Sequence, residues 1–95
     1  MIVVWSDRAL KSLSEIHGRI SAESEERAHS VVDGILRRGD QLSAFPQSGR
    51  RLERFTQREI RELVEGAYRI IYRVRPGHVQ VIDVFHAARR PPWER

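Results

Sequence analysis

The last third of the chain holds three strand-like segments separated by two tight turns, and this pattern limits the fold most. The predicted strands are Ile60–Val64, Tyr68–Val74 and Val79–His86, all rich in aromatic or β-branched residues. Glu65-Gly66 forms the first turn, and Pro76-Gly77 suits the centre of a type II turn in the second. The three segments therefore predict an antiparallel meander. The near-continuous apolarity of the third strand indicates that it is covered on both faces.

The first half of the chain predicts one strand and two helices. Ile2–Trp5 is a short β-branched strand, and Ser6 or Asp7 can cap the helix that follows. A second helix is predicted from Ser21, with acidic residues in its first turn, to about Gly39. Few residues separate the two helices, so they should form an antiparallel hairpin. Apolar positions recur at helical spacing in both, at Ala9, Leu10, Leu13, Ile16 and Ile20, then at Ala28, Val31, Val32, Ile35 and Leu36.

These elements define a fold class and a domain organisation. A chain of 95 residues has room for one hydrophobic core, so residues 1–95 are predicted to form a single domain. The element order β-αα-βββ predicts an α+β fold with the helical hairpin packed on one face of an antiparallel sheet. Residues 43–55, with Pro46 and Gly49, are interpreted as a loop.

Several classes of protein and site are excluded or disfavoured by composition. The chain contains no cysteine, so disulfides and thiolate metal sites are excluded. The four histidines show no metal-ligand spacing, and no cofactor-binding motif is present, so neither metal nor cofactor is expected. No apolar run approaches the roughly 18 residues of a membrane helix, and residues 1–20 lack a signal-peptide core. A cytoplasmic protein without membrane contact is therefore expected.

The positive charge is concentrated in the second half of the chain. Net charge is +4; residues 1–47 hold six basic and seven acidic side chains (−1), and residues 48–95 hold eleven and six (+5). All basic residues except Lys11 are arginine, which suits recognition of phosphate or carboxylate. A nucleic acid or an acidic protein segment is therefore a reasonable partner. The alternative is a GC-rich genome, which explains the arginine count better than the asymmetry.

Strand periodicity places arginines on the sheet face opposite the helices. Arg69 and Arg73 should lie on that face about 7 Å apart along their strand. Arg61, with Leu63, is predicted to join them from the neighbouring strand, and His86 and Arg89 follow at the end of the adjacent one. The alternative is a solvated face where arginine stems cover apolar surface. The opposite set should pack under the helices: Tyr68, Ile70, Tyr72 and Val74.

Four successive motifs carry a family resemblance. "VVWSDRALKSLSEI", "FPQSGR", "RELVEGAYRIIYRV" and "VIDVFHAARRP" resemble the ParE/RelE superfamily of toxins from bacterial type II toxin–antitoxin systems. The resemblance extends from Trp5 to Pro91, and the superfamily fold is also β-αα-βββ. It implies a growth-inhibiting toxin, neutralised by a cognate antitoxin with which it could form a hetero-oligomer.

The superfamily resemblance implies one of two activities. RelE-like members are ribosome-dependent endoribonucleases that cut messenger RNA, and in that case Arg69, Arg89 and His86 are the candidate catalytic residues. ParE-like members catalyse no reaction of their own; they bind DNA gyrase and trap its cleaved-DNA state. A non-toxic binding relative is a third alternative.

The departures from the RelE-like pattern favour the ParE-like activity. The RelE-like lysines on the strand before "YR" have no counterpart, no tyrosine follows Tyr72, and His86 is followed by Ala87 where a nuclease subgroup has tyrosine. We therefore predict a gyrase-binding toxin without catalytic residues, with His86 as a structural or docking residue. The predicted partner-binding residues are Arg61, Arg69, Arg73, His86, Arg89, Arg90 and Trp93.

The final residues are interpreted as a partner-binding tail. The patterned core is predicted to end at His86, and Pro91-Pro92 directs the chain into an extended path. Arginine and tryptophan are frequent interface anchors, which favours contact with a partner. The alternative is that Trp93 packs back on the domain.

Overall fold

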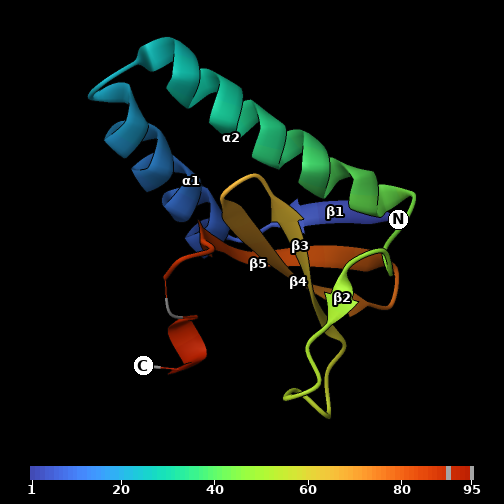
Figure 1. The fold of residues 1–95 in the computed structure, drawn as a ribbon. Helices are drawn as coiled ribbons and strands as arrows, with labels where there is room; N and C mark the ends of the chain where they lie inside the picture. Colours follow the sequence, from blue (N-terminus) through green and yellow to red (C-terminus); the bar gives the residue numbers. More distant parts are fainter. Residues whose placement is uncertain (90, 95) are drawn as a thin grey trace.

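A computed structural model describes residues 1–89 and 91–94, and it shows a helical hairpin lying against one face of a twisted sheet (Figure 1). The predicted β-αα-βββ order is confirmed, with a short additional strand, β2, inside the predicted loop. Short 3₁₀ helices follow α2 and end the described chain. The elements are β1 (Ile2–Trp5), α1 (Asp7–Ser21), α2 (Glu25–Asp40), a 3₁₀ helix (Gln41–Ser43), β2 (Arg50–Arg51), β3 (Ile60–Glu65), β4 (Tyr68–Arg75), β5 (His78–His86) and a 3₁₀ helix (Pro92–Glu94).

The five strands form one sheet in the order β1-β5-β4-β3-β2. Strands β3, β4 and β5 are the predicted antiparallel meander, and β2 extends it with an antiparallel pairing to β3. Strand β1 pairs in parallel with β5, so the sheet is mixed and β5 is flanked by strands on both sides. Gly66 and Gly77 adopt φ values of 57° and 81° in the two meander turns, a conformation that favours glycine.

Two serines fix where the helices begin. The Ser6 hydroxyl accepts from the amide of Ala9 at 3.0 Å and donates to the carbonyl of Ile82 at 2.8 Å, which ties the start of α1 to β5. The second helix begins after Ser24, three residues beyond the predicted Ser21, because α1 continues through Ser21 and Ser24 supplies the capping oxygen.

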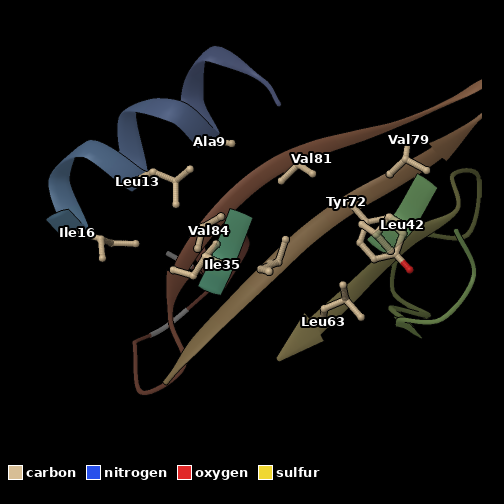
Figure 2. Close-up of a cluster of buried hydrophobic side chains, with 11 residues drawn as sticks. Ala9, Leu13, Ile16, Ile35, Leu42, Leu63, Tyr72, Val79, Val81 and Val84 are labelled. Atoms are coloured by element: carbon tan, nitrogen blue, oxygen red, sulfur yellow. The ribbon is translucent and has the colours of Figure 1, made fainter. Parts of the chain in front are cut away.

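The main core lies between the helices and the sheet (Figure 2). Figure 2 shows α1 side chains directed toward the strand that carries Val81 and Val84. The predicted alternation on β4 is confirmed, because Ile70 and Tyr72 are fully buried and Tyr68 and Val74 pack at the edge of this core. The buried members are Ala9, Leu13, Ile16, Ile35, Leu42, Leu63, Ile70, Tyr72, Val79, Val81 and Val84.

A second apolar cluster covers part of the opposite face of the sheet. Its buried members are Leu52, Ile60 and Ile71, and Trp93 from the C-terminal segment packs against it. The prediction that the patterned core ends at His86 is therefore wrong, because Pro91–Glu94 return the Trp93 ring to the sheet. No helix within the described residues has the length and apolarity needed to cross a membrane.

Candidate partner-binding surface

The sheet face opposite the helices, here called the open face, carries the arginines of β4. Arg69 lies opposite Phe85 of β5, and Arg73 lies opposite Ile60 of β3. Since directly paired residues project to the same face of a sheet, both arginines share the face of the second cluster, as predicted. The pairing of β4 with β5 shifts at Ile71/Tyr72, but the alternation along β4 itself is preserved.

Glu62 is buried on this face and binds two arginines from neighbouring strands. Its Oε1 accepts from Arg50 Nη2 at 2.6 Å, and its Oε2 accepts from Arg69 Nε at 2.7 Å. The side chains of Glu62 and Arg69 are 7% and 17% exposed, while that of Arg50 is 71% exposed. The carboxylate therefore links β2, β3 and β4, with a buried pair to one arginine and a solvent-facing pair to the other.

The pKa of Glu62 results from opposing effects. Burial is the largest single influence and raises the pKa, but hydrogen bonds and charge from Arg50 and Arg69 together outweigh it. The pKa therefore lies below its ordinary value. Glu62 stays ionised at neutral pH, and its charge compensates that of Arg69.

The guanidinium of Arg69 is enclosed by aromatic rings as well as by Glu62. Its Cζ lies 5.0 Å from the centroid of the Phe85 ring and 6.0 Å from that of Trp93. Predicted as a partner-binding residue, Arg69 is already engaged by a carboxylate and two rings. One sequence signal could have identified the partner of Arg69. Glu62 lies two residues after Ile60 on β3, so the two side chains share the open face, and Glu62 is the acidic residue there.

Arg61 does not join the open face, so that part of the prediction is wrong. The register of β3 places Arg61 opposite Tyr72 and Leu63 opposite Ile70, which is the helix-covered face. Burial of Leu63 in the main core fixes this alternation. The Arg61 side chain is 17% exposed; it pairs with Glu59 at 2.8 Å and donates to the carbonyl of Gly49 at 2.8 Å.

Arg61 instead helps to hold the "FPQSGR" loop against the sheet. The hydroxyl of Tyr72 accepts from the amide of Gly49 at 2.8 Å, and a Cβ at Gly49 would lie 2.6 Å from this hydroxyl. Burial raises the pKa of Tyr72, while the hydrogen bond from Gly49 lowers it by less. The hydrogen bond from Arg61 lowers the pKa of Glu59 below its ordinary value. This motif therefore positions the chain that leads into Arg50 and Arg51.

His86 lies on the helix-covered side, away from Arg69. Its ring contacts the Tyr68 ring edge-on at 5.4 Å between centroids, and its Nδ1 accepts from the amide of Ala88 at 3.1 Å. The predicted alternative site of Arg69, His86 and Arg89 is therefore divided between two faces of the sheet. Arg89 is exposed just after β5, and Arg90 lies outside the described residues.

The open face is hollowed into a groove of about 380 Å³. The rings of Phe55, Phe85 and Trp93 form part of its wall, with edge-on ring contacts from Trp93 to Phe55 at 5.4 Å and to Phe85 at 6.1 Å. Sequence reasoning missed Phe55, which the irregular loop carries without a periodic signal. The sequence left two alternatives for Trp93, a partner-binding tail or packing on the domain; in the structure Trp93 packs on the domain and forms part of this wall.

Three arginines gather at one end of the open face. Arg58 lines the groove. Desolvation lowers the pKa of Arg73 below its ordinary value, and the positive charges of Arg75 and Arg58 lower it further. In the described part of the chain, these three guanidinium groups make no ion pair within 4.0 Å. Uncompensated cations beside an apolar groove suit a partner that carries negative charge.

Comparison with known proteins agrees with this architecture. The family model described as "ParE toxin of type II toxin-antitoxin system, parDE" matches residues 3–91. Toxin RelE2 of Caulobacter vibrioides is 36% identical over 87 residues, which cover 92% of this chain and 96% of that protein. Y4kP of Sinorhizobium fredii is 34% identical over 88 residues, or 93% of this chain and 90% of that protein.

A solved structure shows the same fold. A chain from the chromosomal ParDE toxin–antitoxin system of P. aeruginosa has a TM-score of 0.79 and 21% identity, over 90% of this chain and 95% of that chain. From the match over residues 3–91, the chain belongs to the ParE toxin family of type II toxin–antitoxin systems.

Proposed function

We propose that this toxin acts by binding DNA gyrase and trapping its cleaved-DNA state, without catalysing a reaction of its own. The observation that carries the proposal is the pairing of Arg69 with the buried Glu62. A nuclease that cuts RNA must stabilise the negative charge that develops on the phosphorane, and a free cation does this best. A guanidinium that is already compensated by a carboxylate is poorly suited to that role.

The position of His86 supports the same proposal. General acid–base catalysis requires the acid or base to lie within hydrogen-bond reach of the reacting group. His86 contacts Tyr68 on the helix-covered face, whereas Arg69 contacts Phe85 on the open face. One substrate phosphate does not reach both side chains across the sheet.

The second candidate function is a ribosome-dependent messenger RNA endoribonuclease. One observation favours it: a relative that is 36% identical over 92% of this chain carries the name RelE2. In that function Arg69 must leave Glu62 on binding RNA, so that its charge becomes available to the phosphate. A non-toxic relative that binds partners is the third alternative.

A cognate antitoxin is the proposed neutralising partner, and it forms a hetero-oligomer with the toxin in the cytoplasm. We expect an acidic, amphipathic C-terminal segment of the antitoxin to fold on binding over the helical hairpin and the sheet. A groove of about 350 Å³ between α2 and the β3–β4 turn supports this position. Ile20, Val31 and Tyr68 offer apolar contacts there, and Arg27 offers a positive charge.

Growth and binding measurements test the proposal. Induced expression of the toxin alone should arrest growth, and co-expression of the neighbouring open reading frame should restore it. Purified toxin should bind purified gyrase in calorimetry, and Arg89→Ala with Arg90→Ala should weaken that binding at least tenfold. Lys11→Gln with Arg19→Gln is the matched control, because it removes two charges from α1. Normal growth on induction, or equal binding by both double variants, contradicts the proposal.

A further inference from the structure

The groove of the open face combines an apolar lining with an aromatic wall. Ile60, Ile71 and Ile82 line it, and Phe55, Phe85 and Trp93 contribute ring surfaces. Its volume of about 380 Å³ falls within the range of about 300–1,000 Å³ that is usual for small-molecule sites. Aromatic rings beside an apolar slot provide a stacking surface for a planar, unpaired base.

The charged groups around this groove leave an excess of positive charge. Asp83, the carboxylate that lines it, is 7% exposed and accepts from the Ser12 hydroxyl at 2.6 Å and from Arg8 Nε at 3.1 Å. Its charge is thus engaged within the domain. Arg58 lines the groove, and Arg73 lies opposite Ile60, another residue of the lining, on the neighbouring strand.

Arg73 and Arg75 extend the positive charge along β4. They are two residues apart on one strand, so their side chains leave the same face about 7 Å from one another. Arg54 lies beside the aromatic wall, with its Cζ 5.6 Å from the Phe55 centroid and 5.9 Å from that of Trp93. Cations therefore lie both in the groove lining and beside the aromatic rings, where they can contact the phosphates of a strand whose bases stack there.

We propose that the open face of this toxin binds single-stranded DNA, with one unstacked base in the groove and phosphates on Arg58 and Arg73. The inference rests on the proposed function only in the choice of DNA over RNA, because the cleaved-DNA state of gyrase exposes single-stranded DNA. The positive charge and the aromatic ring surface of the open face support a single-stranded nucleic acid independently of that choice. An acidic peptide would satisfy the arginines but would leave the aromatic wall without a stacking partner.

The proposed contacts predict a specific dependence on salt. Each phosphate contact to single-stranded nucleic acid contributes about −0.7 to the slope of log K against log salt concentration. Arg58→Gln with Arg73→Gln should therefore reduce the steepness of that slope by about 1.4. Lys11→Gln with Arg19→Gln removes the same charge from α1 and should leave the slope unchanged. Trp93→Phe keeps a ring in the groove and should bind more strongly than Trp93→Ala.

The experiment measures fluorescence anisotropy of a labelled 20-nucleotide thymidine strand with purified toxin, in the absence of gyrase. We expect saturable binding, at least tenfold weaker for Arg58→Gln with Arg73→Gln, and weaker binding to the same sequence as duplex. Equal losses in the two double variants overturn the proposal, as does the absence of binding. A stronger preference for a 20-nucleotide uridine RNA, or equal competition by polyglutamate, assigns the face to another partner and also overturns it.

The outcome is separable from that of the proposed function. Calorimetry of gyrase with toxin contains no DNA, and the anisotropy measurement contains no gyrase. If the wild-type toxin binds gyrase but not single-stranded DNA, only the inference is overturned. If it binds single-stranded DNA but not gyrase, only the proposed target is overturned. Thermal unfolding of each variant shows whether a loss of binding reflects a loss of fold.

Discussion

Replacing Glu62 with glutamine tests whether one buried carboxylate holds three strands of the sheet together. The substitution keeps the size of the side chain and one acceptor oxygen but removes the charge that compensates Arg69. The side chains of Glu62 and Arg69 are 7% and 17% exposed, so the uncompensated guanidinium stays largely out of water. Breaking a buried pair costs about 3–5 kcal/mol, and the retained acceptor reduces this to about 2–3 kcal/mol.

Thermal unfolding followed by circular dichroism at pH 7 measures this loss. For a domain of 95 residues, about 1 kcal/mol corresponds to about 4–8 °C, so the Tm of Glu62→Gln should fall by about 10–20 °C. Glu53→Gln, at an exposed position in the segment between β2 and β3, is the matched control and should change Tm by less than about 4 °C.

A double-mutant cycle separates the two arginines. Coupling of Glu62 with Arg69 should reach about 2 kcal/mol, because Glu62 is buried and the Arg69 side chain is only 17% exposed. Coupling with Arg50 should stay below about 1 kcal/mol, because its side chain is 71% exposed. Equal couplings, or a Tm of Glu62→Gln within the range of the control, would refute the reasoning.

The pH dependence provides an independent check on the same residue. The folded-state pKa of Glu62 lies below its ordinary value, so its contribution to stability is complete above the unfolded pKa of about 4.3. That contribution is lost as pH falls through the lower, folded-state pKa. Unfolding free energy measured with urea from pH 7 to pH 2 should therefore fall less steeply in Glu62→Gln than in the wild type.

Two further predictions concern the loop and the tail. Tyr72→Phe leaves the buried amide of Gly49 without its acceptor and should cost about 1–2 kcal/mol in urea unfolding. Burial raises the pKa of Tyr72, so the stability of the wild type should also decline above about pH 10. This decline should be smaller in Tyr72→Phe, and equal declines would exclude Tyr72 as its cause. Deletion of residues 91–95 removes Trp93 from Phe55 and Phe85 and should lower stability by about 1–2 kcal/mol and weaken toxicity. An unchanged Tm would show that Trp93 contributes nothing to the fold.

Much of the architecture follows from local patterns in the sequence. The alternation of Ile70 and Tyr72 with Arg69 and Arg73 identifies which side of β4 the helices cover, because burial in one core selects one face. Gly66 and Gly77 mark the meander turns, since their positive φ values favour glycine. These signals involve residues close in sequence, and they predict strands and turns well.

The candidate site depends on contacts that no local pattern contains. The carboxylate of Glu62 meets Arg50 and Arg69 only when β2, β3 and β4 pair in one register. The same register sets the face of Arg61, so the sequence pattern alone predicts the wrong face for this residue. The return of Trp93 to the sheet depends on the three-dimensional path of the chain after Pro91 and Pro92. The sequence of these residues is equally compatible with an extended tail and with a segment that packs on the domain.

The most direct test of the central claim runs two target assays in parallel on the same toxin preparation. One measures cuts in messenger RNA on programmed ribosomes by primer extension. The other measures the linear plasmid that appears when protease digests the gyrase attached to the broken DNA ends. Glu62→Gln with Arg69→Gln accompanies the wild type, because Arg69→Ala alone would leave the buried Glu62 with the solvent-facing Arg50 as its remaining ion-pair partner.

A toxin that traps gyrase should give gyrase-dependent linear plasmid and leave messenger RNA intact. Cuts in messenger RNA that disappear in the double variant, without linear plasmid, would contradict that prediction.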